Sequence, residues 1–207
     1  MKPLIIIGNG GHARACMDVI ISLGNYKIEG YIISDQDFDE TMSAYPVIGK
    51  DRDLKKLLIR SKSVFIAVGQ IKNFQPRLRL YKLIKDHGAK LPTIISPIAF
   101  CSQSASIGEG SILMHNALVN ANTKVGVNCI INTKALLEHD VNVGSHCHIS
   151  TGALINGGVK VGDKSFIGSG VVIKEGVEIG EEVIIGAGLT ITKNIPDGRT
   201  VKHQNHG

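Results

Sequence analysis

The chain has 207 residues, a formal net charge of +5 and 43% hydrophobic residues, which suits one ample core or two small globular domains. Lys and Arg are dispersed and aromatic residues make up only 4% of the chain, which argues against nucleic-acid binding and favours small polyanionic ligands. The four cysteines form no C-x-x-C pair, and no apolar run reaches about 18 residues. We therefore expect a reduced, cytoplasmic protein without membrane insertion.

The first residues predict a strand that turns into a helix. The stretch KPLIIIGNGGHARACMDVI runs from an apolar segment through G-x-G-x-x-A into a helical pattern. Turns of this kind let a phosphate approach backbone N–H groups at a helix N-terminus. Gly10, Gly11 and His12 are therefore candidate nucleotide contacts. The alternatives are a plain tight turn and, for His12, a residue that only opens the helix.

Two further strands of the first half end at polar or glycine residues. The segment KIEGYII ends at Ser34 and Asp35, where a carboxylate can reach a ribose hydroxyl or a base edge. The segment SVFIAVGQ ends at Gly69 and Gln70 and precedes a helical pattern, RLRLYKLIKDHG. All four residues are candidates for binding a nucleotide-linked substrate.

The segment LPTIIS is interpreted as the last strand of this half. Together these elements predict a small, Rossmann-like α/β domain over residues 1–95. Such a domain has too few strands for a nicotinamide-binding fold, so the sequence favours a mononucleotide over a dinucleotide.

The second half repeats every six residues. Each sixth residue from Ile107 to Ile191 is aliphatic, and the residue two positions earlier is small or aliphatic. Glycine follows the aliphatic residue at every third repeat from Gly108 to Gly180, so three hexads make one coil. An amphipathic helix would need apolar residues at i, i+3, i+4 and i+7, which this six-residue repeat does not provide. The pattern predicts an all-β parallel β-helix over residues 96–195, followed by a tail over 196–207.

The register of the repeat assigns two cysteines to the core. Cys129 and Cys147 are 18 residues apart, and both occupy the small inward position. They are expected to stack on adjacent coils as structural residues, because a free cysteine behaves as a small buried hydrophobe. Neither is predicted to be a nucleophile.

The segment LLEHDVNVGSHCHIS raises the question of a metal site. His139, His146 and His148 occupy three different positions of the hexad, so they do not converge as zinc ligands must. We therefore predict no metal. On the residues alone, His139 is either a catalytic base or a surface histidine at a corner, and His146 is a bystander. His115 shares the hexad position of His139 but lies 24 residues upstream on another face.

Four segments together resemble a known family: GNGGHA, VGQIKNFQPRLRLY, INTKALLEHD and HCHISTGALINGGVKVG. The chain resembles the sialic acid O-acetyltransferase (NeuD/PglD-like) family of hexapeptide-repeat sugar acyltransferases over nearly its whole length. The resemblance implies a left-handed β-helix and an acetyl-CoA-dependent homotrimer that binds a nucleotide-linked sugar on the N-terminal domain. It also implies chemistry between neighbouring β-helices. The most similar activity is N-acetylation of nucleotide-linked 4-amino-4,6-dideoxy sugars for bacterial surface glycans.

The same resemblance suggests roles for five residues. It implies that His139 is the general base, that Asp140 orients it and that His148 contacts the acetyl-CoA ligand. It also implies that Asn132 lies on the substrate side and that the Gly157 N–H binds the acetyl carbonyl. Gly157 follows His139 by 18 residues, so the register puts it one coil further on, about 5 Å away. A base beside an oxyanion donor suits direct transfer without an acyl-enzyme.

The C-terminus departs from this family. Many members close with a glycine-asparagine-proline segment that covers the cofactor, whereas this chain ends PDGRTVKHQNHG. The pantetheine arm of coenzyme A is instead expected to meet the backbone of earlier coils. The candidates are Ser169, Gly170, Ala187 and Gly188.

Two other functions remain open at this point. One is O-acetylation of a sialic acid with the same cofactor. The other is a non-catalytic trimeric scaffold, because β-helices also serve as rigid spacers. The sequence does not distinguish UDP, GDP and dTDP as the nucleotide.

Overall fold

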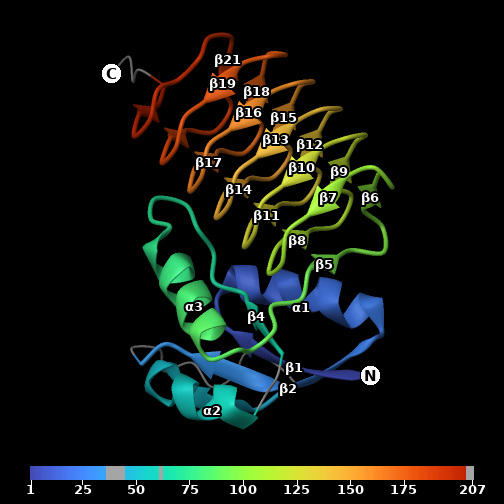
Figure 1. The fold of residues 1–207 in the computed structure, drawn as a ribbon, viewed down its shortest axis with the longest axis vertical. Coiled ribbons are helices and arrows are strands. Elements are labelled where there is room, and N and C mark those ends of the chain that lie inside the picture. The colour runs from blue at the N-terminus through green and yellow to red at the C-terminus, as the bar shows by residue number, and fades with distance from the viewer. Residues whose placement is uncertain (36–44, 61–62, 204–207) are drawn as a thin grey trace.

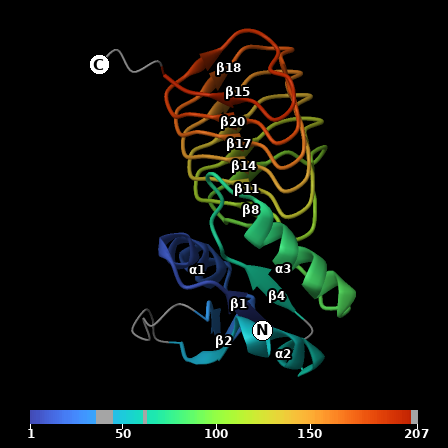
Figure 2. The ribbon, with the colours of Figure 1, turned by 90° about the vertical axis from the view of Figure 1, so that its left-hand side faces the viewer.

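The computed structural model describes residues 1–35, 45–60 and 63–203. It shows an α/β domain at one end of a column of stacked coils (Figure 1). A view turned by 90° shows helices α1 and α3 on opposite sides of the sheet of the α/β domain, both next to the coils (Figure 2). None of the helices in the described part is both long and apolar enough to span a bilayer.

The α/β domain contains a parallel sheet with the strand order β3-β2-β1-β4. Alternate residues of β1 point to opposite faces of this sheet. Leu4 and Ile6 pack with α1, and Ile5 and Ile7 pack with α2 and α3, so helices cover both faces. The Rossmann-like arrangement is confirmed. Its elements are β1 (Lys2–Ile7), α1 (Gly11–Leu23), β2 (Tyr26–Ile33), β3 (Val47–Lys50), α2 (Leu54–Arg60), β4 (Val64–Ile66) and α3 (Gln75–Asp86).

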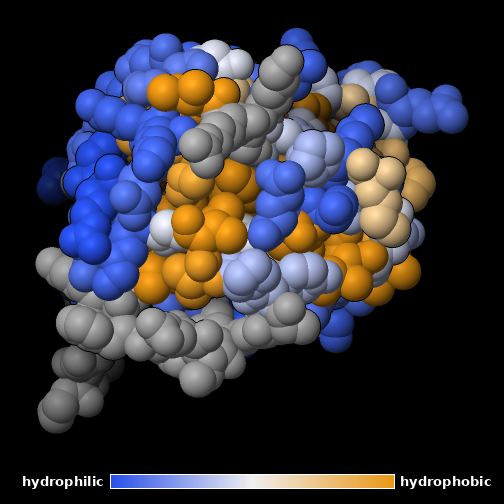
Figure 3. Space-filling model, turned by 90° about the horizontal axis from the view of Figure 1, so that it is seen from below, coloured by the Kyte–Doolittle hydropathy of each residue, from blue (hydrophilic) through white to orange (hydrophobic). Residues whose placement is uncertain are grey.

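The outer end of this domain carries apolar side chains at its surface (Figure 3). Val47 of β3 is exposed, and Ile59 of α2 is 81% exposed. The sheet residues Ile5, Ile7 and Ile32 are buried. The exposed apolar groups of these elements therefore belong to a helix and an edge strand, not to the sheet interior.

The rest of the chain forms a left-handed parallel β-helix with three faces, as predicted. The covered face lies against the α/β domain and contains β5 (Ile94–Ile95), β8 (Ile112–Leu113), β11 (Ile130–Ile131), β14 (His148–Ile149), β17 (Phe166–Ile167), β20 (Ile184–Ile185) and β22 (Thr200–Val201). The apolar face contains β6 (Phe100–Cys101), β9 (Leu118–Val119), β12 (Leu136–Leu137), β15 (Leu154–Ile155), β18 (Val172–Ile173) and β21 (Thr190–Ile191). The polar face contains β7 (Ser106–Ile107), β10 (Lys124–Val125), β13 (Asn142–Val143), β16 (Lys160–Val161) and β19 (Glu178–Ile179).

The second residue of each strand points into the column and the first points outward. Inward residues such as Ile131, Ile149 and Ile167 are fully buried and form one continuous core. The outward residues distinguish the faces. They are Phe100, Leu118, Leu136, Leu154, Val172 and Thr190 on the apolar face, and Ser106, Lys124, Asn142, Lys160 and Glu178 on the polar face. Phe100 and Leu154 are 56% and 39% exposed, so the described part of one chain leaves these residues of the apolar face uncovered.

A column of glycines begins the corner between the polar and covered faces. A Cβ on Gly126 would lie 2.7 Å from the Gly144 carbonyl carbon, and one on Gly162 would lie 2.5 Å from that of Gly180. No side chain fits such a close approach of stacked backbones. The 18-residue glycine period therefore reflects the stacking of coils.

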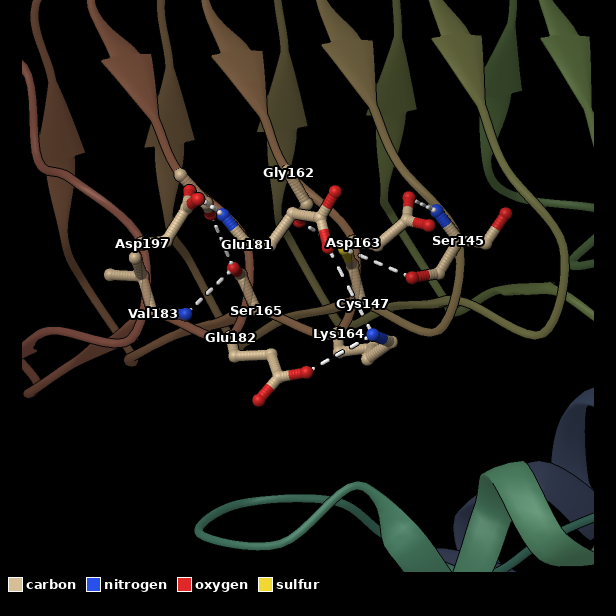
Figure 4. A network of polar contacts seen from close by, with 11 residues as sticks. Ser145, Cys147, Gly162, Asp163, Lys164, Ser165, Glu181, Glu182, Val183 and Asp197 are labelled. Carbon is tan, nitrogen blue, oxygen red and sulfur yellow. Dashed lines mark hydrogen bonds and ion pairs between the residues drawn. The ribbon is translucent and has the colours of Figure 1, made fainter.

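The same corner holds the two cysteines in a ladder with serines. The Cys147 thiol donates to the Gly162 carbonyl at 3.1 Å, as the Ser165 hydroxyl donates to Gly180 at 2.8 Å (Figure 4). The Cys147 N–H in turn donates to Cys129 Sγ at 3.4 Å. Both cysteines are fully buried. Each therefore replaces a serine in a repeating hydrogen-bond pattern, which supports their structural assignment.

Two boundaries differ from the sequence prediction. The segment LPTIIS is not a strand of the α/β sheet, because Ile94–Ile95 pairs with Ile112–Leu113 of the β-helix. In the expected tail, Thr200–Val201 pairs with Ile184–Ile185. Residues 204–207 of that tail lie outside the described residues. The β-helix therefore extends further at both ends than the hexad pattern indicated.

Candidate active site

The carboxyl ends of the α/β strands surround a cavity of about 710 Å³, called here the α/β cavity. Six of the predicted substrate-binding residues line it: Gly10, Gly11, His12, Ser34, Asp35 and Gly69. A Cβ on Gly10 or Gly11 would meet nothing within 4 Å, so the backbone before helix α1 faces open space. This arrangement can accept a phosphate on the helix N-terminus.

A second cavity of about 790 Å³ lies between the α/β domain and the covered face, and is called here the interdomain cavity. It contains the predicted residues Gln70, Asn132, His148, Ser169 and Ala187. His12 and Gly69 line both cavities. The two cavities therefore adjoin at these two residues.

Three of the predicted acetyl-CoA contacts, Gly157, Gly170 and Gly188, fall outside the interdomain cavity. Gly168 and Gly186 line it, whereas Gly170 and Gly188 are not among its lining residues. Gly170 and Gly188 adopt left-handed φ angles of 65° and 70° in the turns that follow. The structure thus replaces Gly170 and Gly188 as candidate acetyl-CoA contacts with Gly168 and Gly186, two residues earlier in the chain.

His148 is held as a neutral imidazole inside the interdomain cavity. Its Nδ1 donates to the Gln70 backbone carbonyl, and its Nε2 accepts from Asn132 Nδ2 at 3.1 Å. The Thr133 N–H donates to Asn132 Oδ1 at 2.8 Å, which fixes the orientation of that amide. The side chain is 5% exposed, and burial lowers the pKa of His148 to about 4. His148 therefore keeps one tautomer and does not take up a proton near neutral pH.

Gln70 joins the two domains through both its backbone and its side chain. Its amide Nε2 donates to the His146 carbonyl at 2.8 Å while its own carbonyl accepts from His148. Gln70, a predicted substrate contact, therefore uses its side-chain N–H group in a hydrogen bond within the protein. Arg77 reinforces the junction, since its fully buried guanidinium donates to Asn128 Oδ1 at 2.6 Å and to the Val68 carbonyl at 2.7 Å.

His146 has structural partners. It is 8% exposed, its Nδ1 lies 3.0 Å from Asn128 Nδ2, and its ring packs edge-on against Tyr81. These contacts support its interpretation as a bystander to catalysis.

His12 is also neutral. Burial, with Arg77 and His148 nearby, lowers the pKa of His12 to about 3. Its Nε2 lies 3.3 Å from Cys16 Sγ, and burial raises the pKa of that thiol to about 12. The protonated thiol therefore donates to Nε2, which leaves the proton on Nδ1. His12 can offer a neutral hydrogen-bond donor but not a positive charge.

His139 lies in contrasting surroundings, at the corner between the apolar and polar faces. Its Nδ1 lies 2.9 Å from Asp140 Oδ2, and the side chains are 62% and 58% exposed. Asp140 has a left-handed φ of 61°, and Asn122 Nδ2 donates to its Oδ1 at 3.3 Å. The His139 hydrogen bond and that from Asn122 lower the pKa of Asp140. The charged carboxylate therefore directs the Nδ1–H and leaves Nε2 free as a base.

Gly157 lies against the ring of His139, one coil further on. A Cβ at Gly157 would lie 2.7 Å from His139 Cε1 and 2.8 Å from Nε2, so a side chain there would displace the ring. Among the described residues, the Gly157 N–H has no hydrogen-bond acceptor. A base and a free N–H donor thus lie together.

One chain does not bring all these residues into one site. His139, Asp140 and Gly157 line neither cavity. They follow strands of the apolar face, whereas Asn132 and Ser169 follow strands of the covered face. The apolar face separates the two groups.

Several residues of the cavities were not singled out from the sequence. Asp51 and Arg79 line the α/β cavity, and Lys72, Phe166 and Lys202 line the interdomain cavity. The position of Phe166 carried a signal, because it is the outward residue one coil after His148. The others depend on how the domains pack.

A hexad β-helix with a histidine-carboxylate pair beside a free N–H, joined to an α/β domain with an open glycine turn, defines a hexapeptide-repeat acyltransferase. Comparisons support this class. Residues 3–83 match the PglD N-terminal domain family, and residues 158–193 match the bacterial transferase hexapeptide (six repeats) family. Among curated protein sequences, none matches the chain.

Two solved proteins are similar over nearly the whole chain. The acetyltransferase domain of PglB from Neisseria gonorrhoeae FA1090 is 33% identical, with 97% of this chain and 96% of that chain covered and a TM-score of 0.85. The same domain in complex with acetyl coenzyme A is matched with a TM-score of 0.86 at 32% identity, over 96% and 95% of the chains. A variant of GDP-perosamine N-acetyl transferase from Caulobacter crescentus, in complex with CoA and GDP-perosamine, is 31% identical over 97% and 93% of the chains, with a TM-score of 0.88.

The chain belongs to the PglD-like hexapeptide-repeat acetyltransferases. The predicted acetyltransferase is thereby confirmed, and the non-catalytic scaffold is set aside.

Proposed function

We propose that this protein transfers an acetyl group from acetyl-CoA to the 4-amino group of a nucleotide-linked 4-amino-4,6-dideoxy sugar. The ligands of its relatives, acetyl coenzyme A in one and CoA with GDP-perosamine in the other, support this substrate class. The observation that carries the proposal is the stack of His139, Asp140 and the free Gly157 N–H. The free thiols of all four cysteines fit the reducing cytoplasm.

The reaction follows from that stack. The sugar amine attacks the thioester carbon, and His139 Nε2 takes the proton that the amine loses. The Gly157 N–H donates to the oxygen on which negative charge develops. When the carbon–sulfur bond breaks, the imidazolium returns its proton to the leaving thiolate of CoA. Asp140 stabilises the imidazolium through Nδ1, and no acyl-enzyme forms.

The nucleotide occupies the α/β cavity in this proposal. Its phosphates meet the N–H groups at Gly10 and Gly11, and Asp35 accepts from a hydroxyl or the base. The sugar then extends past His12 and Gly69 into the interdomain cavity, where His148 and Asn132 lie.

A second copy of the chain completes the site. The apolar face is flanked on one side by the corner of His139 and on the other by the corner of Asn132 and Ser169. Its outward residues are apolar except for Thr190 of β21, and Phe100 and Leu154 are exposed in one chain. Packing of this face in a closed ring joins unlike edges of neighbouring copies. In a homotrimer, His139 of one chain then meets the cavities of the next.

Thiol release from acetyl-CoA, measured against a panel of UDP-, GDP- and dTDP-linked 4-amino sugars, tests the proposal. We expect turnover with at least one amino sugar and none with its 4-hydroxy analogue. Turnover with a free sialic acid and none with any amino sugar would overturn it in favour of O-acetylation.

A further inference from the structure

The charged side chains that line the interdomain cavity are all positive among the described residues. Lys72 and Lys202 line it, and none of its described lining residues is Asp or Glu. Phe166, Ile184 and Ile71 supply apolar wall. The α/β cavity differs, because Asp35 and Asp51 are part of its lining. The interdomain cavity therefore suits a ligand with a long neutral arm and an anionic end.

Lys72 is carried by a segment that is fixed at both ends. On one side of it, Gln70 bonds to His146 and His148 of the β-helix. On the other side, the ring of Phe74 lies 5.7 Å from Lys164 Nζ. The segment thus spans the covered face beside the cavity, and Lys72 lies between two anchored residues.

Lys202 is positioned by β22, which breaks the period of the repeat. Ile184 pairs with Thr200, only 16 residues later, where the hexads would give 18. The Lys202 Cα lies 3.6 Å from the Cβ position of Gly186. Beyond it, His203 Nε2 lies 3.1 Å from the Ala187 carbonyl. Residues 200–203 are therefore folded back over Gly186, which lines the interdomain cavity.

We propose that Lys72 and Lys202 bind the phosphate groups of acetyl-CoA, and that β22 covers the cofactor. The pantetheine arm lies along Phe166 and Ile184, with the acetyl group toward His148. The inference rests on the proposed use of acetyl-CoA. A lysine ammonium suits this role because it is a compact charge that pairs with phosphate.

Isothermal titration with acetyl-CoA, S-acetylpantetheine and the nucleotide diphosphates GDP and UDP tests the assignment. The variants are Lys72→Met, Lys202→Met and the charge-keeping Lys202→Arg. Lys124→Met is the matched control, because Lys124 is an exposed outward residue of the polar face and lines neither cavity. All three substituted side chains are exposed, so folding is expected to persist and is checked by thermal melting.

Lys72→Met and Lys202→Met should each weaken acetyl-CoA binding about 10-fold, equivalent to about 1.4 kcal/mol. Lys202→Arg and Lys124→Met should bind as the unmodified protein does. S-acetylpantetheine carries no nucleotide phosphates, so its affinity should not change. Unchanged acetyl-CoA affinity in both Lys→Met variants would overturn the proposal, as would a loss confined to GDP or UDP. Binding is the readout, so failure to acetylate any amino sugar would count against the proposed function alone.

Discussion

His139 and His148 come from the same repeat and the same short stretch, yet their surroundings are opposite. The side chain of His139 is 62% exposed at a corner and pairs with a carboxylate. His148 is 5% exposed on the covered face and bonds to an amide and a carbonyl. The difference follows from hexad position, because a corner residue projects into solvent whereas an outward strand residue of the covered face meets the α/β domain.

This contrast separates two chemical roles. His139 has a free Nε2 and a partner that stabilises its charged form, as a general base requires. His148 has both ring nitrogens engaged and a pKa lowered by burial to about 4, so it remains neutral. One histidine can therefore move a proton, and the other can only orient a ligand or its neighbours.

The largest expected effect comes from removing the base. His139→Ala should lower turnover by about 10²- to 10⁴-fold with acetyl-CoA affinity kept, because the amine loses its proton acceptor. Asp140→Asn should lower turnover by a smaller factor, since the imidazole of His139 remains. His115→Ala, at the same hexad position on another corner, is the control and should keep full turnover. Wild-type turnover of His139→Ala at every pH from about 6 to 9 would assign the base elsewhere.

A smaller loss should follow when the histidine stays but is displaced. In Gly157→Ala the new methyl group would lie 2.7 Å from His139 Cε1, so the exposed ring must swing away. Turnover should fall about 10- to 100-fold, as misplacement of a catalytic group does. The melting temperature should not change, because the ring can move into solvent. Full activity in this variant would show that the observed stacking is not the reactive geometry.

The buried histidines should be visible in the pH dependence of stability. The pKa values of His148 and His12 are lowered to about 4 and about 3, from 6.5. Between pH 6.5 and these lowered pKa values, the unfolded chain binds protons at the two histidines and the folded chain does not. Stability should therefore be complete above pH 6.5 and fall as the pH drops, by up to about 1.4 kcal/mol per pH unit for each histidine.

Urea unfolding from pH 7 to 4.5 measures that slope. His148→Asn should reduce the slope, whatever it does to the stability at pH 7, and adding His12→Asn should reduce it further. An unaltered slope in the double variant would mean that neither histidine is held neutral by the fold.

The smallest effect concerns the cysteine ladder. Cys147→Ser should keep the side-chain hydrogen bond to the Gly162 carbonyl, whereas Cys147→Ala should lose it and about 1 kcal/mol of stability. The backbone bond from the Cys147 N–H to Cys129 Sγ should persist in both variants. Turnover should stay near normal in both. A hundredfold loss of turnover in Cys147→Ser without a change in stability would instead indicate a reactive thiol.

The sequence predicted the structural features that depend on the six-residue repeat. The hexads identified the aliphatic column, the glycine contacts at one corner and the position of Gly157 beside His139. It assigned the strand at Ile94–Ile95 to the wrong domain and did not predict β22, because two-residue strands have little signal outside the repeat. The contact between Gln70 and His148 joins residues 78 apart, and only the packing of the two domains creates it.

The central claim is that His139 of one chain serves the cavities of another. It is tested by co-expressing two differently tagged variants and isolating mixed oligomers. His139→Ala lacks the base, and Gly11→Trp fills the α/β cavity, since a Cβ at Gly11 meets nothing within 4 Å. Each variant alone should be nearly inactive, and the mixed oligomer should regain a substantial part of wild-type thiol release. Activity no higher than that of the two parents, in mixed oligomers that still bind acetyl-CoA, would contradict the shared site.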